Sequence, residues 1–234
     1  DDICSPLFEN WTLIIVPFSN KMKAWFTGEA KMVRRLLQLY VGLGLYGLST
    51  AMFIRSDLGV DPWDVFHLGV GLQLGMTIGT VIILTGAAVL LLWIPLRQMP
   101  GLGTISNVIC IGLAADASMA LIPELDSLSV RIAFLVSGIV MNAIATSMYI
   151  GAGFGPGPRD GLMTGIHARL GWSIRSVRTS IEVSVLLIGC VLGGTFGVGT
   201  VVYALTIGPL IQLCLPWFRQ KPSVAEIAQP ERVV

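Results

Sequence analysis

The sequence has few charged residues, a net charge close to zero and none of the short motifs of common soluble enzymes. Only 12% of its 234 residues are charged, whereas 54% are hydrophobic, and the mean hydropathy is +0.78. A net charge of +1 gives no basic surface for nucleic acid. P-loop, HExxH and GxSxG motifs are absent from the sequence. Because a soluble domain of this length could not cover so much apolar surface, we expect the lipid bilayer to be its main partner.

The cysteines show no spacing of a metal site or a disulfide framework. Cys4, Cys110, Cys190 and Cys214 form no CxxC pair, and the last three lie in apolar stretches. In such surroundings cysteine usually packs as a small hydrophobic residue. We therefore expect no disulfide, no metal and no cofactor.

Six apolar stretches reach the roughly 20 residues that a helix needs to cross the hydrocarbon core. They cover residues 36–54, 77–96, 104–122, 132–150, 174–194 and 200–218. They predict an all-α membrane protein with six transmembrane helices. Too little chain is left over for a second folded domain, so we expect no soluble catalytic module and no enzyme.

The basic residues are distributed very unevenly between the predicted loops. With a cytoplasmic N-terminus and six crossings, 13 of the 15 Lys and Arg residues are cytoplasmic, and only Arg55 and Arg131 lie outside. This bias follows the positive-inside rule and predicts that both termini are cytoplasmic.

The two ends of the chain are predicted to be cytoplasmic, as an N-terminal segment over residues 1–34 and a tail over 219–234. The stretch 11–18 is short and lacks a basic flank before it, so it does not read as a signal peptide. Met22 or Met32 could be the natural start of the protein. Residues 1–21 are then either a disordered segment or not part of the natural protein.

An internal repeat organises the rest of the chain. A shift of 96 residues aligns residues 35–116 with 131–212, with 23 identities among 82 pairs. The identical pairs include Gly59 with Gly155, Pro62 with Pro158, Asp64 with Asp160, Gly103 with Gly199 and Thr104 with Thr200. These are not the residue types that random apolar similarity would select. The pattern indicates a duplication, with one membrane repeat over 35–122 and a second over 131–218.

Each repeat is predicted to contain a span, a Gly/Pro loop, a short helix, a second span, a Gly-x-Gly-Thr turn and a third span. Because three crossings are an odd number, the second copy enters from the opposite side, as in the inverted repeats of many secondary transporters. The short helices at 62–74 and 158–170 are then re-entrant or interfacial. The alternative is that they cross fully, which gives eight crossings and parallel repeats. Their shortness and their charged residues argue against it.

The starts of the two short helices carry the most distinctive residues. Asp61 or Gly157 suits the N-cap, a proline follows, and Asp64 or Asp160 takes the third position, where a carboxylate meets free backbone N–H groups. Capping is therefore one interpretation of these residues. The other is that broken backbone at membrane depth lines a substrate or ion path, with Arg159 beside Asp160. Both interpretations can hold.

The two histidines, His67 and His167, lie on the two short helices. His67 follows Asp64 by three residues and His167 follows Asp160 by seven, so each pair shares a helix face and could pass protons. Because the histidines do not occupy matching repeat positions, interfacial residues without that role are the simpler interpretation.

Arg178 and Glu182 stand four residues apart in the fifth predicted span, which suits an ion pair across one helical turn. A carboxylate in lipid is costly, so we expect Glu182 to have a functional role. Asp116, Asn107 and Asn142 are weaker candidates, since a lone polar group often only holds helices together.

Four segments resemble a known family. They read LGVDPWDVF at 58–66, GLGT at 101–104, GPGPRDGLM at 155–163 and RTSIE at 178–182. Through them, residues 35–218 resemble the YczE/YyaS/YitT family of bacterial membrane proteins. The resemblance implies a protein of the bacterial cytoplasmic membrane. The positions that it singles out, without catalytic roles, are Asp61, Asp64, Arg159, Asp160, Arg178 and Glu182.

We expect a small secondary transporter or channel, with its substrate between the repeats near the membrane midplane. The carboxylates favour a cation, an amine or proton coupling, although Arg159 and the helix N-termini leave an anion open. The alternative is a non-transporting membrane assembly or regulatory subunit. An intramembrane enzyme is least favoured, for want of a nucleophile and base at workable spacing. The small molecule or ion is not identified by the sequence, and a homo-oligomer stays open.

Cysteine labelling from each side of the membrane tests the six-crossing arrangement. Single cysteines at Arg55 and Leu125 should react from outside, and those at Arg97 and Arg169 from inside. Finding Arg97 and Arg159 on the outer side would instead support eight crossings.

Overall fold

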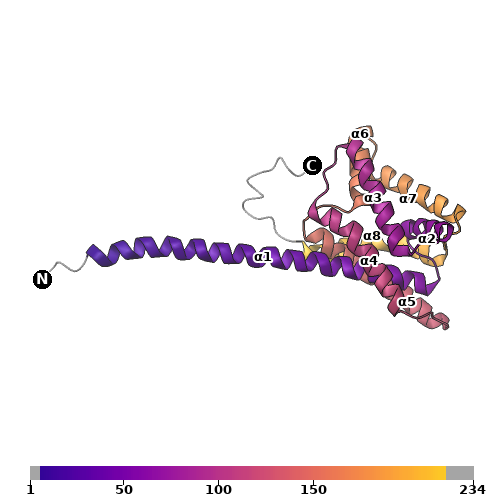
Figure 1. Cartoon of the computed structure of the whole chain (residues 1–234), viewed down its shortest axis with the longest axis horizontal. Coiled ribbons are helices and arrows are strands. Elements are labelled where there is room, and N and C mark those ends of the chain that lie inside the picture. The colour runs from indigo at the N-terminus through magenta and orange to yellow at the C-terminus, as the bar shows by residue number, and fades with distance from the viewer. Residues whose placement is uncertain (1–5, 220–234) are drawn as a thin grey trace. The chain divides into compact units, whose positions relative to one another are not determined.

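The computed structural model describes residues 6–219, with side chains from residue 31 onward, and this part of the chain consists of helices joined by loops (Figure 1). Its eight helices are α1 (Pro6–Ser56), α2 (Pro62–Leu74), α3 (Ile78–Leu96), α4 (Leu102–Leu121), α5 (Leu128–Gly151), α6 (Pro158–Leu170), α7 (Ile174–Val191) and α8 (Val198–Phe218). The chain divides into two units, Asp1–Leu37 and Gln38–Val234, and the packing and the site described below belong to the second. The predicted tail, apart from its first residue, lies outside the described residues.

Among the described residues, five helical segments are long and apolar enough to cross a membrane. They are Lys31–Ser56 of α1 together with α3, α4, α5 and α8. The sixth predicted span corresponds to α7, which is not among the five. It carries Arg175, Arg178 and Glu182 within 18 residues, and these lower its hydropathy. Its crossing therefore stays a prediction.

The two short helices begin and end where the sequence predicts. α2 and α6 have 13 residues each and begin at Pro62 and Pro158. Each is followed by a glycine in the left-handed region, Gly75 with φ 65° and Gly171 with φ 68°. A helix of this length reaches about 20 Å, which is short of the roughly 30 Å hydrocarbon core.

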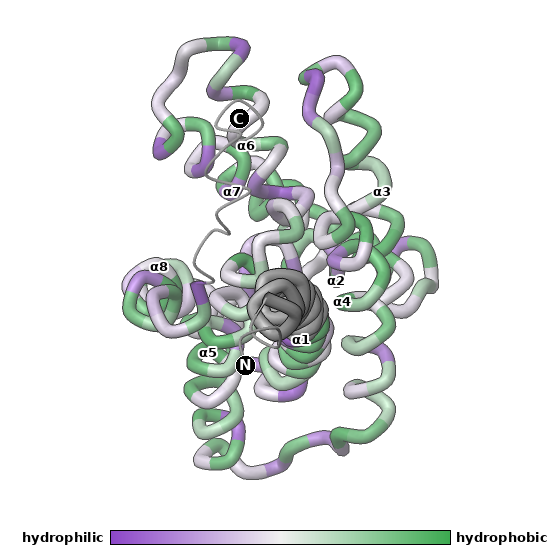
Figure 2. Tube along the Cα trace, turned by 90° about the vertical axis from the view of Figure 1, so that its left-hand side faces the viewer, coloured by the Kyte–Doolittle hydropathy of each residue, from purple (hydrophilic) through white to green (hydrophobic). Residues whose placement is uncertain are grey.

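The outer surface of the long helices is apolar, as a lipid solvent requires. Leu91 and Ile94 of α3 expose 66% and 70% of their surface, and Leu205 of α8 exposes 72%. Figure 2 shows hydrophobic residues along much of α3 and α5. In water such exposure would be unfavourable, whereas lipid tails match these side chains.

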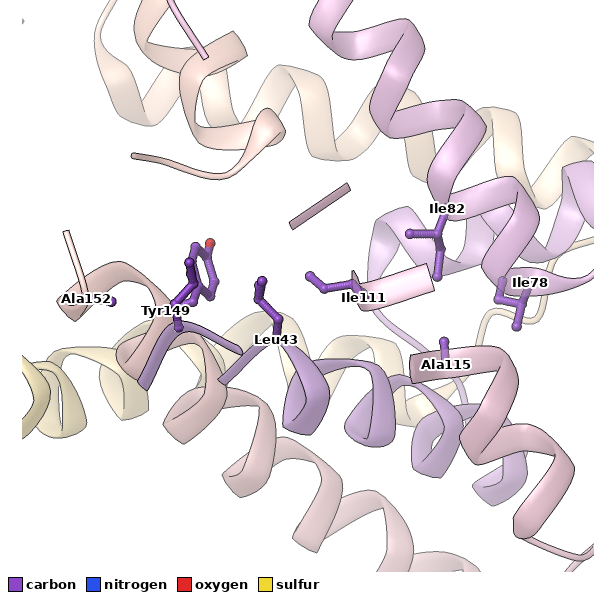
Figure 3. Packing of buried hydrophobic residues seen from close by; sticks show 8 residues of the cluster. Leu43, Ile78, Ile82, Ile111, Ala115, Tyr149 and Ala152 are labelled. Atoms are coloured by element: carbon purple, nitrogen blue, oxygen red, sulfur yellow. The ribbon is translucent and has the colours of Figure 1, made fainter. Parts of the chain in front are cut away.

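A buried apolar cluster joins helices from both halves of the chain. Leu43 of α1, Ile82 of α3, Ile111 of α4 and Tyr149 of α5 belong to it (Figure 3). These helices come from residues far apart in the sequence, so the cluster packs the two halves of the chain against each other.

Each short helix packs against a long helix from the other half of the chain, α2 on α7 and α6 on α3. Two backbone hydrogen bonds link the loops before these helices to the Gly-x-Gly-Thr turns. Gly103 N donates to the Phe154 carbonyl at 2.8 Å, and Gly199 N donates to the Leu58 carbonyl at 2.7 Å. The two donors are 96 residues apart in the sequence, and so are the two acceptors, which is the offset of the predicted repeat. The turns thereby position the starts of α2 and α6.

Close packing of α7 on α2 depends on Gly189. A Cβ there would lie 2.5 Å from Phe66 N and 2.6 Å from its Cα. We expect Gly189→Ala to lower the free energy of unfolding by about 1–3 kcal/mol through overpacking. Gly44→Ala is the matched control, because a Cβ at Gly44 meets nothing within 4 Å, and it should stay within about 1 kcal/mol of the wild type. Unfolding in detergent measures both, and equal effects would contradict this packing.

Candidate functional site

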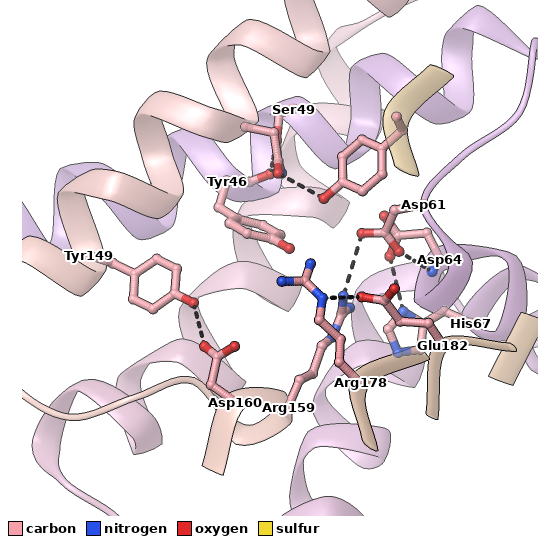
Figure 4. Close-up of polar contacts among 12 residues, drawn as sticks. Tyr46, Ser49, Asp61, Asp64, His67, Tyr149, Arg159, Asp160, Arg178 and Glu182 are labelled. Carbon is pink, nitrogen blue, oxygen red and sulfur yellow. Dashed lines mark hydrogen bonds and ion pairs between the residues drawn. The ribbon is translucent and has the colours of Figure 1, made fainter. Parts of the chain in front are cut away.

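A cavity of about 260 Å³ lies between the two short helices and the long helices around them, and all eight helices contribute to its lining. Its titratable Asp, Glu, His and Arg residues are Asp61, Asp64, His67, Arg159, Asp160, Arg178 and Glu182. The fold thus brings seven of the eight predicted site residues to one cavity (Figure 4).

Asp61 both caps α2 and pairs with an arginine from the other half of the chain. Its Oδ1 accepts a hydrogen bond from Asp64 N at 2.8 Å, which confirms the predicted N-cap. Its Oδ2 lies 3.4 Å from Nη1 of Arg159. Burial raises the pKa of Asp61, with Asp64 adding to the effect and Arg159 opposing it. Since only 2% of Asp61 is exposed, pairing with a cation compensates its buried charge.

Asp64 and His67 form a buried hydrogen-bonded pair, with Asp64 Oδ1 3.0 Å from His67 Nδ1. Burial raises the pKa of Asp64 to about 6, although Arg159 opposes it. Burial and the charge of Arg159 together lower the pKa of His67 to about 3, although Asp61 opposes them. At neutral pH the imidazole is therefore uncharged, so the contact is a hydrogen bond rather than an ion pair.

Two buried oxygens beside this pair make no hydrogen bond of good geometry in the described part of the chain, although the Thr50 hydroxyl lies close enough to the Asp64 carboxyl to lower its pKa. They are Asp64 Oδ2 and Thr50 Oγ1, and both residues line the cavity. A buried polar atom without a partner is costly. Asp64 Oδ2 can therefore accept a hydrogen bond from a group that enters the cavity, and the Thr50 hydroxyl can accept or donate one.

Arg159 reaches from α6 to the aromatic face of Trp63 on α2. Its Cζ lies 4.8 Å from the ring centroid, which is cation–π geometry. Burial by itself would lower the pKa of Arg159, but Asp61 and the other acidic groups around it raise it overall. The guanidinium is therefore a permanent positive charge held between a ring and a carboxylate.

Asp160 has a hydroxyl partner rather than a basic one. Tyr149 donates from its hydroxyl to Asp160 Oδ2 at 3.1 Å, and Asp160 takes part in none of the ion pairs found among the described residues. Burial raises the pKa of Asp160, and the Tyr149 hydrogen bond opposes this.

On α7, Arg178 Nε donates to Glu182 Oε1 at 2.9 Å, which confirms the predicted ion pair.

His167, the remaining predicted site residue, is not among the residues that line the cavity. Its Nδ1 lies 2.6 Å from the Trp172 carbonyl oxygen, near the end of α6. Asp116 is likewise elsewhere, where it accepts from Gly79 N at 2.8 Å and from the Thr77 hydroxyl at 2.6 Å and so caps α3.

Sequence reasoning missed the aromatic part of the cavity. Tyr46, Trp63, Tyr149 and Tyr203 line it, each from a different helix. The one available signal was that Trp63 stands 96 residues before Arg159, at the matching repeat position. A tyrosine inside an apolar span otherwise carries no mark that distinguishes a lining residue from a core residue.

Asn142 lies beside this aromatic wall and joins three helices. It accepts from the Tyr203 hydroxyl at 3.0 Å and donates to Ser49 Oγ at 2.9 Å. A role in holding helices together is one of the uses considered for it from the sequence, and these contacts agree with it.

Within residues 31–219, no three His, Cys, Asp or Glu side chains are grouped as a metal site would need. The expectation of no metal or cofactor stays a prediction.

Comparison with known proteins gives one family and three relatives. Residues 33–216 match the model of DUF6198, a family of unknown function. An uncharacterized protein of Haemophilus influenzae is 36% identical over 199 residues, which cover 85% of this chain and 90% of that protein. The uncharacterized membrane protein YczE of Bacillus subtilis is 30% identical over 80% of this chain and 88% of its own length. YyaS of the same organism is 25% identical over 76% and 92%. No solved structure matches the chain.

The raised pKa of Asp64 predicts a pH-dependent contribution to stability. A carboxyl whose pKa is higher in the folded than in the unfolded protein stabilises the folded state most when both states are protonated, below the unfolded pKa of about 3.9. This stabilisation of the folded state is lost as the pH rises through the folded pKa of about 6. Asn cannot titrate. Between pH 4 and pH 7 the wild type should therefore lose up to about 3 kcal/mol relative to Asp64→Asn. Unfolding at both pH values measures the difference, with Asp126→Asn, in a loop outside the cavity, as the control. A constant difference would contradict the burial of an ionisable Asp64.

Proposed function

This chain belongs to the DUF6198 family, and we propose that it is a small secondary transporter or channel of the bacterial cytoplasmic membrane. One observation carries the proposal. Four carboxylates and two arginines from both halves of the chain meet at a single cavity inside a bundle with lipid-compatible outer faces. Asp61 and Asp64 are buried, whereas the Arg178 and Glu182 side chains are 53% and 37% exposed. Ionisable groups among membrane spans are costly and are typical of substrate and ion paths.

We propose six crossings arranged as two inverted repeats, with both termini in the cytoplasm. The 96-residue sequence repeat supports this arrangement, as do the two hydrogen bonds that join matched loops and turns in opposite order. α7 is the sixth crossing in this proposal. Its Arg178 and Glu182 line the cavity, so their charges do not have to face lipid.

The charges of the cavity favour a positively charged substrate or proton coupling. Asp61 pairs with Arg159, and Glu182 pairs with Arg178. Asp64 and Asp160, which occupy matching repeat positions, have no arginine or lysine partner among the described residues. Two carboxyl groups are thus left to bind a cation, an amine or a proton. We propose transport rather than enzymatic chemistry, because the lining residues include no Ser or Cys and His67 is bonded to Asp64.

Flux into proteoliposomes tests the proposal. We expect wild-type protein to move a cation, an amine or protons, and Asp160→Asn or Glu182→Gln to reduce that flux at least tenfold, since each removes a charge from the path. Glu124→Gln is the matched control, because Glu124 is 91% exposed, and it should leave flux unchanged.

The opposite result would favour the membrane assembly or regulatory subunit. In that result, no ion or amine of a broad panel would be bound or transported, and Asp160→Asn and Glu182→Gln would change only the stability of the protein.

A further inference from the structure

Trp63 and Arg159 contact each other although they belong to the two different repeats proposed above. They are 96 residues apart and occupy the same position in the two repeats, yet they lie in direct contact, with 4.8 Å between Cζ and the ring centroid. In an arrangement of two related halves, matching positions can touch only near the axis that relates them. In the inverted arrangement proposed above, that axis runs in the membrane plane. Their contact then lies near the midplane, where alternating access places the substrate.

The surroundings of the Arg159 guanidinium are those of a binding site for a planar or rounded cation. It lies over an aromatic face and beside a carboxylate, with further carboxylates on the same cavity. Its distance to Asp61 Oδ2 is 3.4 Å, which is longer than the roughly 2.7–2.9 Å of a strong charge-assisted hydrogen bond. The arginine therefore occupies a cation site without binding it tightly.

The cavity also holds acceptors that Arg159 leaves unused. Asp64 Oδ2 and Thr50 Oγ1 are buried close to each other and make no hydrogen bond of good geometry in the described residues, and Asp160 has only the Tyr149 hydroxyl as a hydrogen-bonded side-chain partner there. A cation that carries N–H donors would satisfy such oxygens.

The rest of the cavity wall argues for an organic rather than an inorganic cation. Tyr46, Trp63 and Tyr149 present aromatic rings, and aliphatic side chains cover much of the remaining wall. Inorganic cations prefer a shell of oxygen ligands, whereas ammonium groups on an apolar body are recognised by aromatic faces together with carboxylates.

We propose that this cavity binds a small organic cation, with an ammonium or guanidinium group, which displaces the Arg159 side chain from Trp63 and Asp61. Arg159 is then a tethered competitor that occupies the site when the substrate is absent. It keeps Asp61 from being left as a buried, unpaired charge between two binding events. The inference rests on the proposed function for its transport step, but the binding step can be measured by itself.

Binding is tested on the full chain in detergent, by calorimetry and thermal shift, with benzylammonium chloride as the probe and sodium chloride and sodium benzoate as controls. We expect wild-type protein to bind benzylammonium and not benzoate. Trp63→Leu should weaken this binding about tenfold through the lost cation–π contact. Trp63→Phe should weaken it less.

Arg159 provides the sharper test. Removing the tethered competitor should let Arg159→Ala bind millimolar guanidinium, and should strengthen benzylammonium binding about tenfold. Arg131→Ala is the matched control, because Arg131 also pairs with an aspartate, Asp57 at 2.8 Å, but does not line the cavity. Its cation binding should equal that of the wild type. Arg159→Lys retains the charge and should give a smaller increase, so it replaces Arg159→Ala if that variant does not fold.

Benzoate binding that disappears in Arg159→Ala would overturn the inference, because Arg159 would then be an anion ligand. Cation binding that neither Trp63 nor Arg159 variants change would overturn it as well. Proton or sodium flux without organic-cation binding would refute the inference and leave the proposed function standing. Organic-cation binding with these variant effects but without flux would support the site and count against transport.

Discussion

The structure depends on hydrogen-bond partners for the backbone groups that are left free where helices are interrupted inside a lipid-facing bundle. Lipid offers no hydrogen bonds, so interrupted helices persist only where protein or a water-filled cavity supplies partners. Here the Gly-x-Gly-Thr turns supply them. Gly103 N bonds the Phe154 carbonyl and Gly199 N bonds the Leu58 carbonyl, while Thr104 Oγ1 donates to the Pro156 carbonyl at 2.7 Å. The chain can therefore stop and restart a helix beside its own centre.

These bonds also decide which groups face the cavity. Gly59 and Gly155 adopt φ of 113° and 117°, a backbone conformation that strongly favours glycine, and a Cβ at either would meet a threonine hydroxyl within 3 Å. The loops consequently approach the turns closely, and α2 and α6 begin at the cavity. Asp61 thus caps α2 with one oxygen, as predicted, and faces Arg159 with the other, whereas its place on a substrate or ion path stays a prediction.

Local sequence patterns predicted local structure well. The caps and limits of α2 and α6 and the Arg178–Glu182 pair follow from spacing along one helix, so no knowledge of the fold was needed. Hydropathy was less decisive for α7, because charges that face a cavity lower its average in the same way as charges that face water. The aromatic wall was missed for a related reason, since periodicity does not show which face of an apolar helix meets the cavity.

The sequence by itself determined that the protein is a helical membrane protein, because composition and the length of apolar runs are properties of the chain alone; self-similarity likewise predicted the repeat. Only the tertiary structure decided that Trp63 meets Arg159, that Tyr149 bonds Asp160 and that His167 lies away from the cavity. These outcomes depend on contacts between helices distant in sequence, or on which way a helix face turns, and packing alone sets both.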